Sequence, residues 1–489
     1  MNNINFAQTI IKSSQNYPNK LAYRDGTDLT YGELSVRIRQ VAKGLVKQGL
    51  KPGDHIVLIM EDCVDWPAVF LACVYIGVVP LTLSTVVSNE LFWQISQFAD
   101  CKLVISGKNN VVKDNALMPI IDRKDVQNFY TTESTDIAPV MRHPDSPVYM
   151  GISSGSTGMP KVAVHRHQVF YEMIRIGPLS FGMTGDDTIL SIAKMSWGYG
   201  LQNSLTYTLG LGATAIVIPE LPSSNVVFDY INRYTPSIVV TSPGIIRRML
   251  ATAEDKYLLP SGIKHFHSSS EHTPAAIYDR FLARFGIQLR SSIGMMETCQ
   301  NYAADYEGME HDRGTVGKVL PNCQVKLLDA DGDLVQEGQV GEIYVNTPAA
   351  AMYYYKNYEK TKQTFVGNWV RTGDCGYWNE KGNLVFSGRT DDIFKVNDLI
   401  VSPVAIEAEI VADPTVDQAV VTGVKNLNDV TEVHAFIVPK DSFDLSTFNL
   451  ALSKKLFPHQ MPKRVHLVDA IPETMTNKKD RKNAVNLIS

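Results

Sequence analysis

An alternation of apolar and polar positions near the N-terminus predicts an amphipathic helix. Thr30 and Glu33 have the S/T-x-x-E spacing of a capping box, in which two side chains bond to the free backbone N–H groups at a helix start. Apolar residues then recur at steps of four, three and four, which places them on one helical face: Leu34, Ile38, Val41 and Leu45. We expect this helix to end near Gly49.

Strand-like and helix-like runs alternate after this helix. The apolar runs HIVLIM at residues 55–60 and CKLVISG at residues 101–107 are typical of buried strands. Residues 66–89 between them carry no charge and are long enough to cross a bilayer. Because Gly77 and Pro80 divide this stretch, it predicts a buried helix and a buried strand instead of a membrane span. The alternation returns over residues 165–295, so we expect an α/β fold with doubly wound parallel sheets.

The pattern changes from about residue 310. Short strand-like runs separated by turn sequences such as D-A-D-G and E-K-G-N predict a small β-rich subdomain over about 310–389. After Arg389 we expect a helix near 404–410, strands near 418–424 and 432–438, and a helix near 446–456. The sequence therefore predicts a large N-terminal domain, 1–389, and a separate α+β C-terminal domain, 390–489.

Composition narrows the classes of function. The chain has 489 residues, is 44% hydrophobic and 20% charged, and carries a net charge of −5, which provides no basic surplus for binding nucleic acid. Six scattered cysteines form no C-x-x-C pair, and the N-terminus lacks a basic segment followed by an apolar run. We expect a cytoplasmic protein that binds neither nucleic acid nor a membrane.

The most informative segment is SSGSTGMPK at residues 153–161. Its hydroxyls, backbone N–H groups and terminal lysine suit a polyphosphate. It differs from the G-x-x-x-x-G-K-[ST] loop of kinases and GTPases, because Met-Pro separates Gly158 from Lys161 and Val162 follows the lysine. Taken alone, the segment is also compatible with a flexible Ser/Gly linker.

The segment resembles the phosphate loop of the adenylate-forming superfamily of acyl-CoA ligases, peptide-synthetase adenylation domains and luciferases. Other motifs along the chain favour this interpretation over a flexible segment. Further motifs of that superfamily follow in order: GMME at 294–297, GEIYV at 341–345, MYYY at 352–355, RTGD at 371–374, GRTDDIFK at 388–395 and PETMTNK at 472–478. The pattern is most similar to benzoate-CoA and other aryl-CoA ligases.

The resemblance implies that a carboxylate attacks the α-phosphate of ATP and that pyrophosphate leaves. Catalysis of this step depends on positioning and charge neutralisation. The implied catalytic residues are Lys478, which bridges the two reactants, Glu297, which holds Mg²⁺, and Lys161. Asp391 is the implied hinge between the domains. The implied nucleotide-binding residues are Ser153, Ser154, Gly155, Ser156, Thr157, Gly158, Lys161, Ser270, Glu271, Ile293, Gly294, Met296, Asp374, Arg389 and Lys395.

The chain departs from the superfamily pattern at several positions. Asp398 replaces a glycine on the pantetheine path, which puts transfer to a thiol in question. Asn477 replaces the glycine before Lys478, and Met296 replaces a threonine near the phosphates. The remaining departures are Val162, Ser269 and Ser270, each in place of a glycine.

The acid site is expected near residues 193–217, which resemble the A-Y-G-L-G-N stretch of aryl-CoA ligases. No aspartate lies near Ser196 to hold an amino acid. A neutral pocket formed by Trp197, Tyr199, Gly200, Ser268 and Gly294 would suit a flat apolar ring, although both aromatic residues are equally compatible with an ordinary core. For the neighbouring His265, His267 and His272 we expect a structural or substrate-orienting role.

The sequence thus predicts ATP-dependent adenylation of an aromatic or alicyclic acid and its transfer to coenzyme A or to the phosphopantetheine of a carrier protein. We expect any carrier protein to be a separate chain. Two alternatives remain open: transfer to an amine, which Asp398 would tolerate better, and a catalytically weak nucleotide- or acyl-binding protein.

Overall fold

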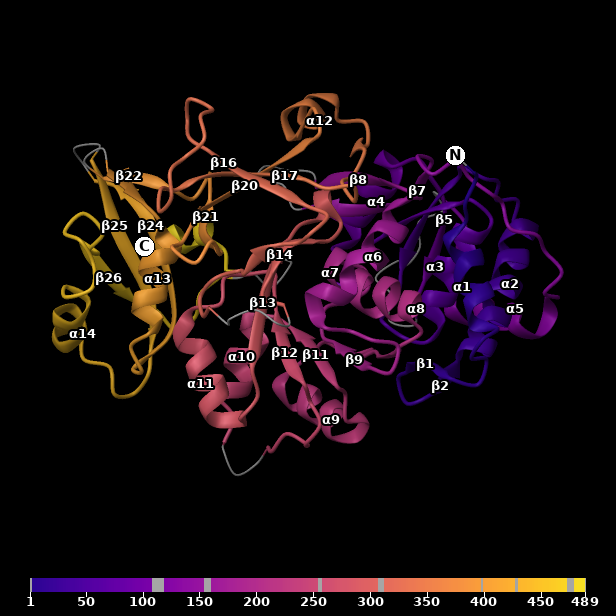
Figure 1. Cartoon of the computed structure of the whole chain (residues 1–489), viewed down its shortest axis with the longest axis horizontal. Helices are drawn as coiled ribbons and strands as arrows, with labels where there is room; N and C mark the ends of the chain where they lie inside the picture. Colours follow the sequence, from indigo (N-terminus) through magenta and orange to yellow (C-terminus); the bar gives the residue numbers. More distant parts are fainter. Residues whose placement is uncertain are drawn as a thin grey trace.

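The computed structural model describes residues 2–107, 118–153, 160–253, 257–306, 312–396, 399–426, 430–472 and 479–488. Its strands form two large sheets and three smaller ones. Figure 1 shows the large sheets with their helices in one part of the molecule and the C-terminal elements gathered at the opposite end.

The first large sheet has seven strands in the order β18-β8-β7-β4-β3-β5-β6. Strands β3, β4, β5, β6 and β7 are mutually parallel, as predicted, whereas β8 and β18 add an antiparallel edge. The bounds are β3 His55–Ile59, β4 Val79–Thr82, β5 Cys101–Ser106, β6 Ile120–Asp122, β7 Pro147–Ser153, β8 Lys161–Arg166 and β18 Tyr353–Tyr354.

The second large sheet has nine strands in the order β15-β14-β13-β12-β11-β9-β10-β1-β2. Its centre is parallel, and both ends are antiparallel. The bounds are β1 Leu21–Arg24, β2 Asp28–Thr30, β9 Thr188–Ser191, β10 Thr214–Ile216, β11 Ile238–Thr241, β12 His265–Ser268, β13 Leu289–Gly294, β14 Asn301–Ala304 and β15 Lys318–Val319.

The helices of this part cover the large sheets. They are α1 Phe6–Ser14, α2 Tyr31–Lys47, α3 Asp65–Tyr75, α4 Asn89–Phe98, α5 Arg123–Thr132, α6 Val169–Phe181, α7 Gly198–Gly200, the π-helix η1 Leu201–Tyr207, α8 Thr208–Leu211, α9 Ser224–Tyr234, α10 Pro243–Leu250, α11 Ala275–Phe285 and the 3₁₀ turn η2 Met296–Thr298. The predicted capping box at Thr30 and Glu33 is confirmed at the start of α2.

The uncharged stretch at residues 66–89 does form a buried helix and a buried strand. All residues of α3 are buried, and β4 lies in the first sheet between β3 and β7. In the described part of the chain, no helix is long and apolar enough to cross a membrane.

A smaller five-stranded sheet follows. It contains β16 Gln324–Leu328, β17 Gly341–Asn346, β19 Phe365–Val366, β20 Trp369–Trp378 and β21 Leu384–Arg389, and helix α12 spans Tyr358–Thr364. The strands predicted around 324–346 and 384–389 are therefore confirmed. Two short strands of the same stretch, β15 and β18, instead extend the large sheets.

The C-terminal elements form sheets of their own. They are β22 Phe394–Val396, β23 Leu399–Val401, α13 Pro403–Val411, β24 Val416–Lys425, β25 Thr431–Pro439, α14 Leu445–Leu452, β26 Arg464–Leu467, α15 Arg481–Ala484 and the 3₁₀ turn η3 Val485–Ile488. The predicted helix over 446–456 is too long, since α14 ends at Leu452. Apolar side chains of α11 and α13 share one core, which joins this part to the second sheet (Figure 1).

One buried carboxylate holds α3 against its neighbouring helices. Asp65 is almost fully buried and accepts hydrogen bonds from four side chains of α2 and α5: Arg37 at 3.1 Å, Arg123 at 2.7 Å, Gln127 at 3.1 Å and Tyr130 at 2.9 Å. Removing one partner of a buried ion pair leaves the other charges uncompensated.

We therefore predict that Asp65→Ala lowers the free energy of unfolding by about 3 to 5 kcal/mol. The control is Asp28→Ala, which removes an exposed pair with Arg24 (3.0 Å) and should cost less than about 1 kcal/mol. Urea denaturation of both variants measures the difference, and equal losses would contradict a special role for Asp65.

Candidate functional site

The two ends of the predicted phosphate loop, Ser153 and Lys161, lie on the paired strands β7 and β8. Ser153 and Lys161 form the last paired position of this antiparallel ladder. Residues 154–159, which include the predicted contacts Ser154, Gly155, Ser156, Thr157 and Gly158, lie outside the described residues. The paired strands therefore fix both ends of the predicted loop beside the carboxyl end of β7.

Glu297 is the centre of the site. Its side chain is fully buried, and Oε1 accepts a hydrogen bond from Ser153 Oγ at 2.5 Å and lies 3.5 Å from Lys161 Nζ. The hydroxyl of Tyr354 also donates to Oε1, and Lys161 Nζ donates to Tyr354 Oη at 3.0 Å. Three predicted residues, Ser153, Lys161 and Glu297, are thus in mutual contact.

Tyr354 is the member of this cluster for which the sequence predicted no role. It lies on β18, which pairs with β8 so that Tyr354 faces Ala163. Burial, together with the negative charge of Glu297, raises the pKa of the Tyr354 phenol, so the hydroxyl stays protonated and can donate. The only sequence signal was the MYYY stretch, which gives no register against β8.

The second oxygen of Glu297 suits a metal ion. Oε2 is buried and has no hydrogen-bond partner among the described residues. Carboxylate and hydroxyl oxygens are the ligands that Mg²⁺ prefers, and Mg²⁺ is commonly held by one or two carboxylates together with substrate phosphates. The residues present therefore fit Mg²⁺, with Glu297 as the protein ligand.

Met296 occupies space provided by two glycines. A Cβ atom on Gly151 would lie 2.3 Å from Met296 Sδ, and a Cβ on Gly198 would lie 3.4 Å from Met296 Cε. The thioether therefore fills the gap between β7 and the start of α7, where a threonine hydroxyl would leave empty volume.

Asp374 and Arg389 are cross-strand partners on β20 and β21. Arg389 Nε lies 3.9 Å from Asp374 Oδ1, and the Arg389 side chain is half exposed. The ring of Tyr302 is fully buried nearby: burial and the charge of Asp374 both raise the pKa of its phenol. An acceptor and a cation thus lie together at the edge of the small sheet, an arrangement suited to ribose hydroxyls or phosphate.

The segment after β12 lies between the sheets and the C-terminal part. Ser269 Oγ donates to Ser292 O at 2.9 Å, and Ser270 has a φ of +81°, the left-handed region in which glycine is relaxed and serine is strained. Glu271 lies 4.0 Å from Arg247. Ser270 thus adopts the backbone of the glycine it replaces.

The predicted acid pocket lies at the start of α7. Tyr199 Oη lies 3.5 Å from the backbone oxygen of His267, and burial raises the pKa of this phenol well above its usual range. A Cβ on Gly200 would lie 2.0 Å from Lys194 O, so the close backbone approach requires glycine there. Trp197 is half-buried just before α7.

Further predicted pocket residues end the strands of the second sheet. Ser268 is the last residue of β12, and its hydroxyl lies 3.0 Å from that of Thr273. Ile293 and Gly294 end β13, and a Cβ on Gly294 would lie 2.7 Å from Gln300 O. The carboxyl ends of β12 and β13 therefore place Ser268 and Gly294 at the same sheet edge.

The three histidines are uncharged. Burial lowers the pKa of His265 to about 3 and of His272 to about 4, and it places that of His267 well below the usual value. No group of three or more metal-ligating side chains occurs among the residues for which placement is described.

The predicted hinge Asp391 is exposed in the turn after β21, and Lys395 is exposed on β22. Asp398, Asn477 and Lys478 lie outside the described residues. The neighbour of Lys478 is placed: Lys479 Nζ donates to Ala419 O at 2.8 Å. Burial lowers the pKa of Lys479, and the nearby charges of Glu407, Arg247 and Glu271 also act on this pKa. The described chain after residue 478 thus resumes close to Glu271.

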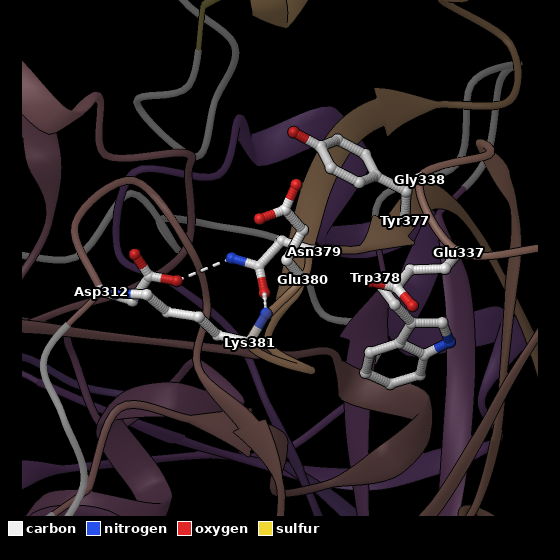
Figure 2. Close-up of a pocket in the computed structure, with 8 residues that line it drawn as sticks. All are labelled: Asp312, Glu337, Gly338, Tyr377, Trp378, Asn379, Glu380 and Lys381. Atoms are coloured by element: carbon white, nitrogen blue, oxygen red, sulfur yellow. Dashed lines mark hydrogen bonds between the residues drawn. The ribbon is translucent and has the colours of Figure 1, made fainter.

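A separate hollow of about 530 Å³ lies beside the small sheet (Figure 2). Asp312 accepts hydrogen bonds there from Asn379 at 2.6 Å and from Asn383 at 2.8 Å. None of the predicted site residues lines this open hollow.

Comparison with known proteins identifies the family of the chain. The model of the AMP-binding enzyme family matches residues 11–355, and that of the AMP-binding enzyme C-terminal domain matches residues 405–478. Since the first match covers more than half of the sequence, the chain belongs to the AMP-binding enzyme family.

Aryl-CoA ligases are among the similar proteins. A benzoate–CoA ligase of Thauera aromatica is 30% identical over 94% of this chain and 90% of its own length. The structure of a benzoate CoA ligase from Burkholderia xenovorans LB400 has 29% identity and a TM-score of 0.91 over 98% of this chain and 99% of that one. An anthranilate CoA ligase in complex with anthranoyl-AMP, 24% identical, shares the fold with a TM-score of 0.94 over 99% and 97% of the two chains.

We predict that Tyr354→Phe raises the Mg²⁺ concentration needed for half-maximal ATP–pyrophosphate exchange roughly three- to tenfold, the equivalent of one lost hydrogen bond of about 1 kcal/mol. Without the hydroxyl, Lys161 loses an acceptor and competes with the metal ion for Glu297. Tyr353→Phe is the matched control, because Tyr353 faces the other side of the same strand. An unchanged Mg²⁺ dependence would contradict this role.

Proposed function

We propose that this protein is an ATP-dependent acid–thiol ligase that converts an aromatic carboxylic acid to its coenzyme A thioester. The observation that carries the proposal is the cluster of Ser153, Lys161 and Glu297. It joins the ends of the predicted phosphate loop to a buried carboxylate, one oxygen of which has no hydrogen-bond partner among the described residues. The 30% identity to a benzoate–CoA ligase over 94% of the chain supports the aromatic acid and coenzyme A.

In the first half-reaction, an oxygen of the substrate carboxylate forms a bond to the α-phosphorus of ATP, and the bond from that phosphorus to the pyrophosphate oxygen breaks. Lys161 screens the departing charge, and Lys478 bridges the carboxylate and the α-phosphate. Glu297 would hold Mg²⁺, which supplies further neutralisation of phosphate charge. Asp374 accepts from the ribose hydroxyls, and Arg389 provides a further cation.

In the second half-reaction, the sulfur of coenzyme A attacks the carbonyl carbon of the aroyl-adenylate, AMP leaves, and the thiol proton is released to solvent. We propose that residues 390–489 form a domain that turns about Asp391 between the two half-reactions. A separate carrier protein bearing phosphopantetheine would present the same thiol, and it is the alternative acceptor.

We further propose that the reaction takes place in the cytoplasm. All six cysteines are unpaired and buried, as expected in a reducing compartment.

The first test is ATP–pyrophosphate exchange with a panel of aromatic, alicyclic, fatty and amino acids. We predict exchange with aromatic acids, and a loss of about a hundredfold or more in Lys478→Ala and in Glu297→Gln, because each removes a charge that stabilises the transition state. Lys482→Ala, a change on the exposed side of α15, is the control and should retain full exchange. Exchange with no acid would indicate a binding protein without ligase activity.

The acceptor is tested with a preformed aroyl-adenylate. We predict that coenzyme A releases AMP faster than a primary amine does, and that Asp398→Gly increases the rate with coenzyme A, since a carboxylate on the pantetheine path repels the approaching phosphates. Faster release by the amine would favour amide formation, and an unchanged rate in Asp398→Gly would show that this carboxylate does not obstruct the thiol.

A further inference from the structure

His267 is a buried polar side chain that the proposed mechanism does not use. It lies on β12 between β11 and β13, and it is fully buried. Its ring centroid lies 4.0 Å from that of Phe181 on α6. Neither ring nitrogen has a hydrogen-bond partner among the described residues.

The ring is uncharged, because burial lowers its pKa well below the usual value and the neighbouring His265 and Arg290 act in the same direction. A neutral imidazole presents one N–H donor and one nitrogen acceptor. Buried polar groups in folded proteins are nearly always paired, so two unpaired nitrogens on one buried ring indicate a missing partner.

The ring lies on the acid side of the site. Phe266, the preceding residue of β12, packs on Phe281 of α11, so the alternation of the strand turns His267 toward α6 and η1. Phe181 contacts both His267 and Tyr207 of η1, and the ring centroids of Phe181 and Tyr207 lie 5.9 Å apart. Tyr199 Oη approaches the backbone oxygen of His267 itself.

Further unpaired polar atoms lie on the same helix. Gln202 Nε2 and Asn203 Oδ1 on η1 are buried and have no partner in the part of the chain that the structure describes. Gln202 Oε1 accepts from Tyr207 Oη at 3.4 Å, and Asn203 Nδ2 donates to Tyr199 O at 2.8 Å. Each side chain is thus fixed at one end by a hydrogen bond, while the polar atom at its other end has no described partner.

We infer that the acid carries a hydroxyl or amino substituent on its ring and that His267 recognises this substituent by a hydrogen bond. The inference rests on the proposed function and narrows its substrate class. An unsubstituted ring would leave both nitrogens of His267 unpaired, whereas a hydroxyl group both donates and accepts and an amino group donates. His267 is thus a residue that determines which acid is chosen.

The experiment compares acids of nearly equal size that differ in hydrogen bonding. The ratio kcat/KM in ATP–pyrophosphate exchange is measured for benzoate and for the hydroxy-, amino- and methyl-benzoates substituted at each ring position. At one position we expect the wild-type protein to prefer the hydroxy or amino acid over its methyl counterpart by about tenfold or more. A preference for methyl-substituted or unsubstituted acids at every position would overturn the inference.

Variants of His267 test whether this side chain causes the preference for hydroxy or amino acids. His267→Val should abolish the preference and raise the relative activity with the methyl acid, whereas His267→Asn, which keeps a donor and an acceptor, should retain part of it. His265→Val is the matched control, because His265 is buried on the same face of β12 but two residues farther from its carboxyl end. It should leave the preference unchanged, and a loss of preference in His265→Val alone would contradict the assignment.

The outcomes separate the two proposals. Exchange with no acid would refute the proposed ligase activity, whereas exchange that does not distinguish hydroxy, amino and methyl acids would refute only the role of His267. If His267→Val does not fold, the wild-type acid series and His267→Asn decide the question.

Discussion

The site depends on the buried carboxylate of Glu297, of which one oxygen has hydrogen-bond partners and the other has none among the described residues. One oxygen receives hydrogen bonds from β7 and β18 and lies near the ammonium group of β8, whereas the other has no described partner. A buried charge is costly unless paired, and Lys161 at 3.5 Å compensates it incompletely. The fold therefore holds a carboxylate oxygen suited to a cation before any substrate binds.

The backbone around this carboxylate explains several departures from the family pattern. Met296 is accommodated because Gly151 and Gly198 leave the volume that its thioether fills. Ser270 has a left-handed backbone conformation, which glycine adopts without strain, and the neighbouring Ser269 is held by its bond to the Ser292 carbonyl. The described backbone thus accommodates each of these residues. They therefore give no structural reason to regard the chain as a degenerate binding protein.

Local patterns in the sequence predicted most of the elements. The cap of α2, the division of residues 66–89 and the strands around 324–346 follow from spacing and turn residues, and the order of the motifs assigned Ser153, Lys161 and Glu297 to one phosphate site. Tyr354 could not be found in this way, because its role depends on how β18 pairs with β8 across nearly two hundred residues of sequence. The antiparallel sheet edges and the π-helix η1 likewise arise from tertiary pairing, which short-range periodicity does not encode.

The two ends of the candidate site differ in the charge of their side chains. Both can exist in one site because strands of both large sheets contribute residues to it. Loops follow the carboxyl ends of the parallel strands in each large sheet, so β7 of the first sheet and β12 and β13 of the second sheet each contribute a residue to the candidate site. The phosphate end combines the carboxyl group of Glu297 with the amino group of Lys161, 3.5 Å away. At the acid end, burial favours the uncharged forms of the side chains, because it lowers the pKa of His267 and raises that of Tyr199. Under the proposed function, a cationic residue there would compete with Lys161 and Lys478 for the substrate carboxylate, whereas neutral donors and acceptors can discriminate among rings without attracting the reacting group.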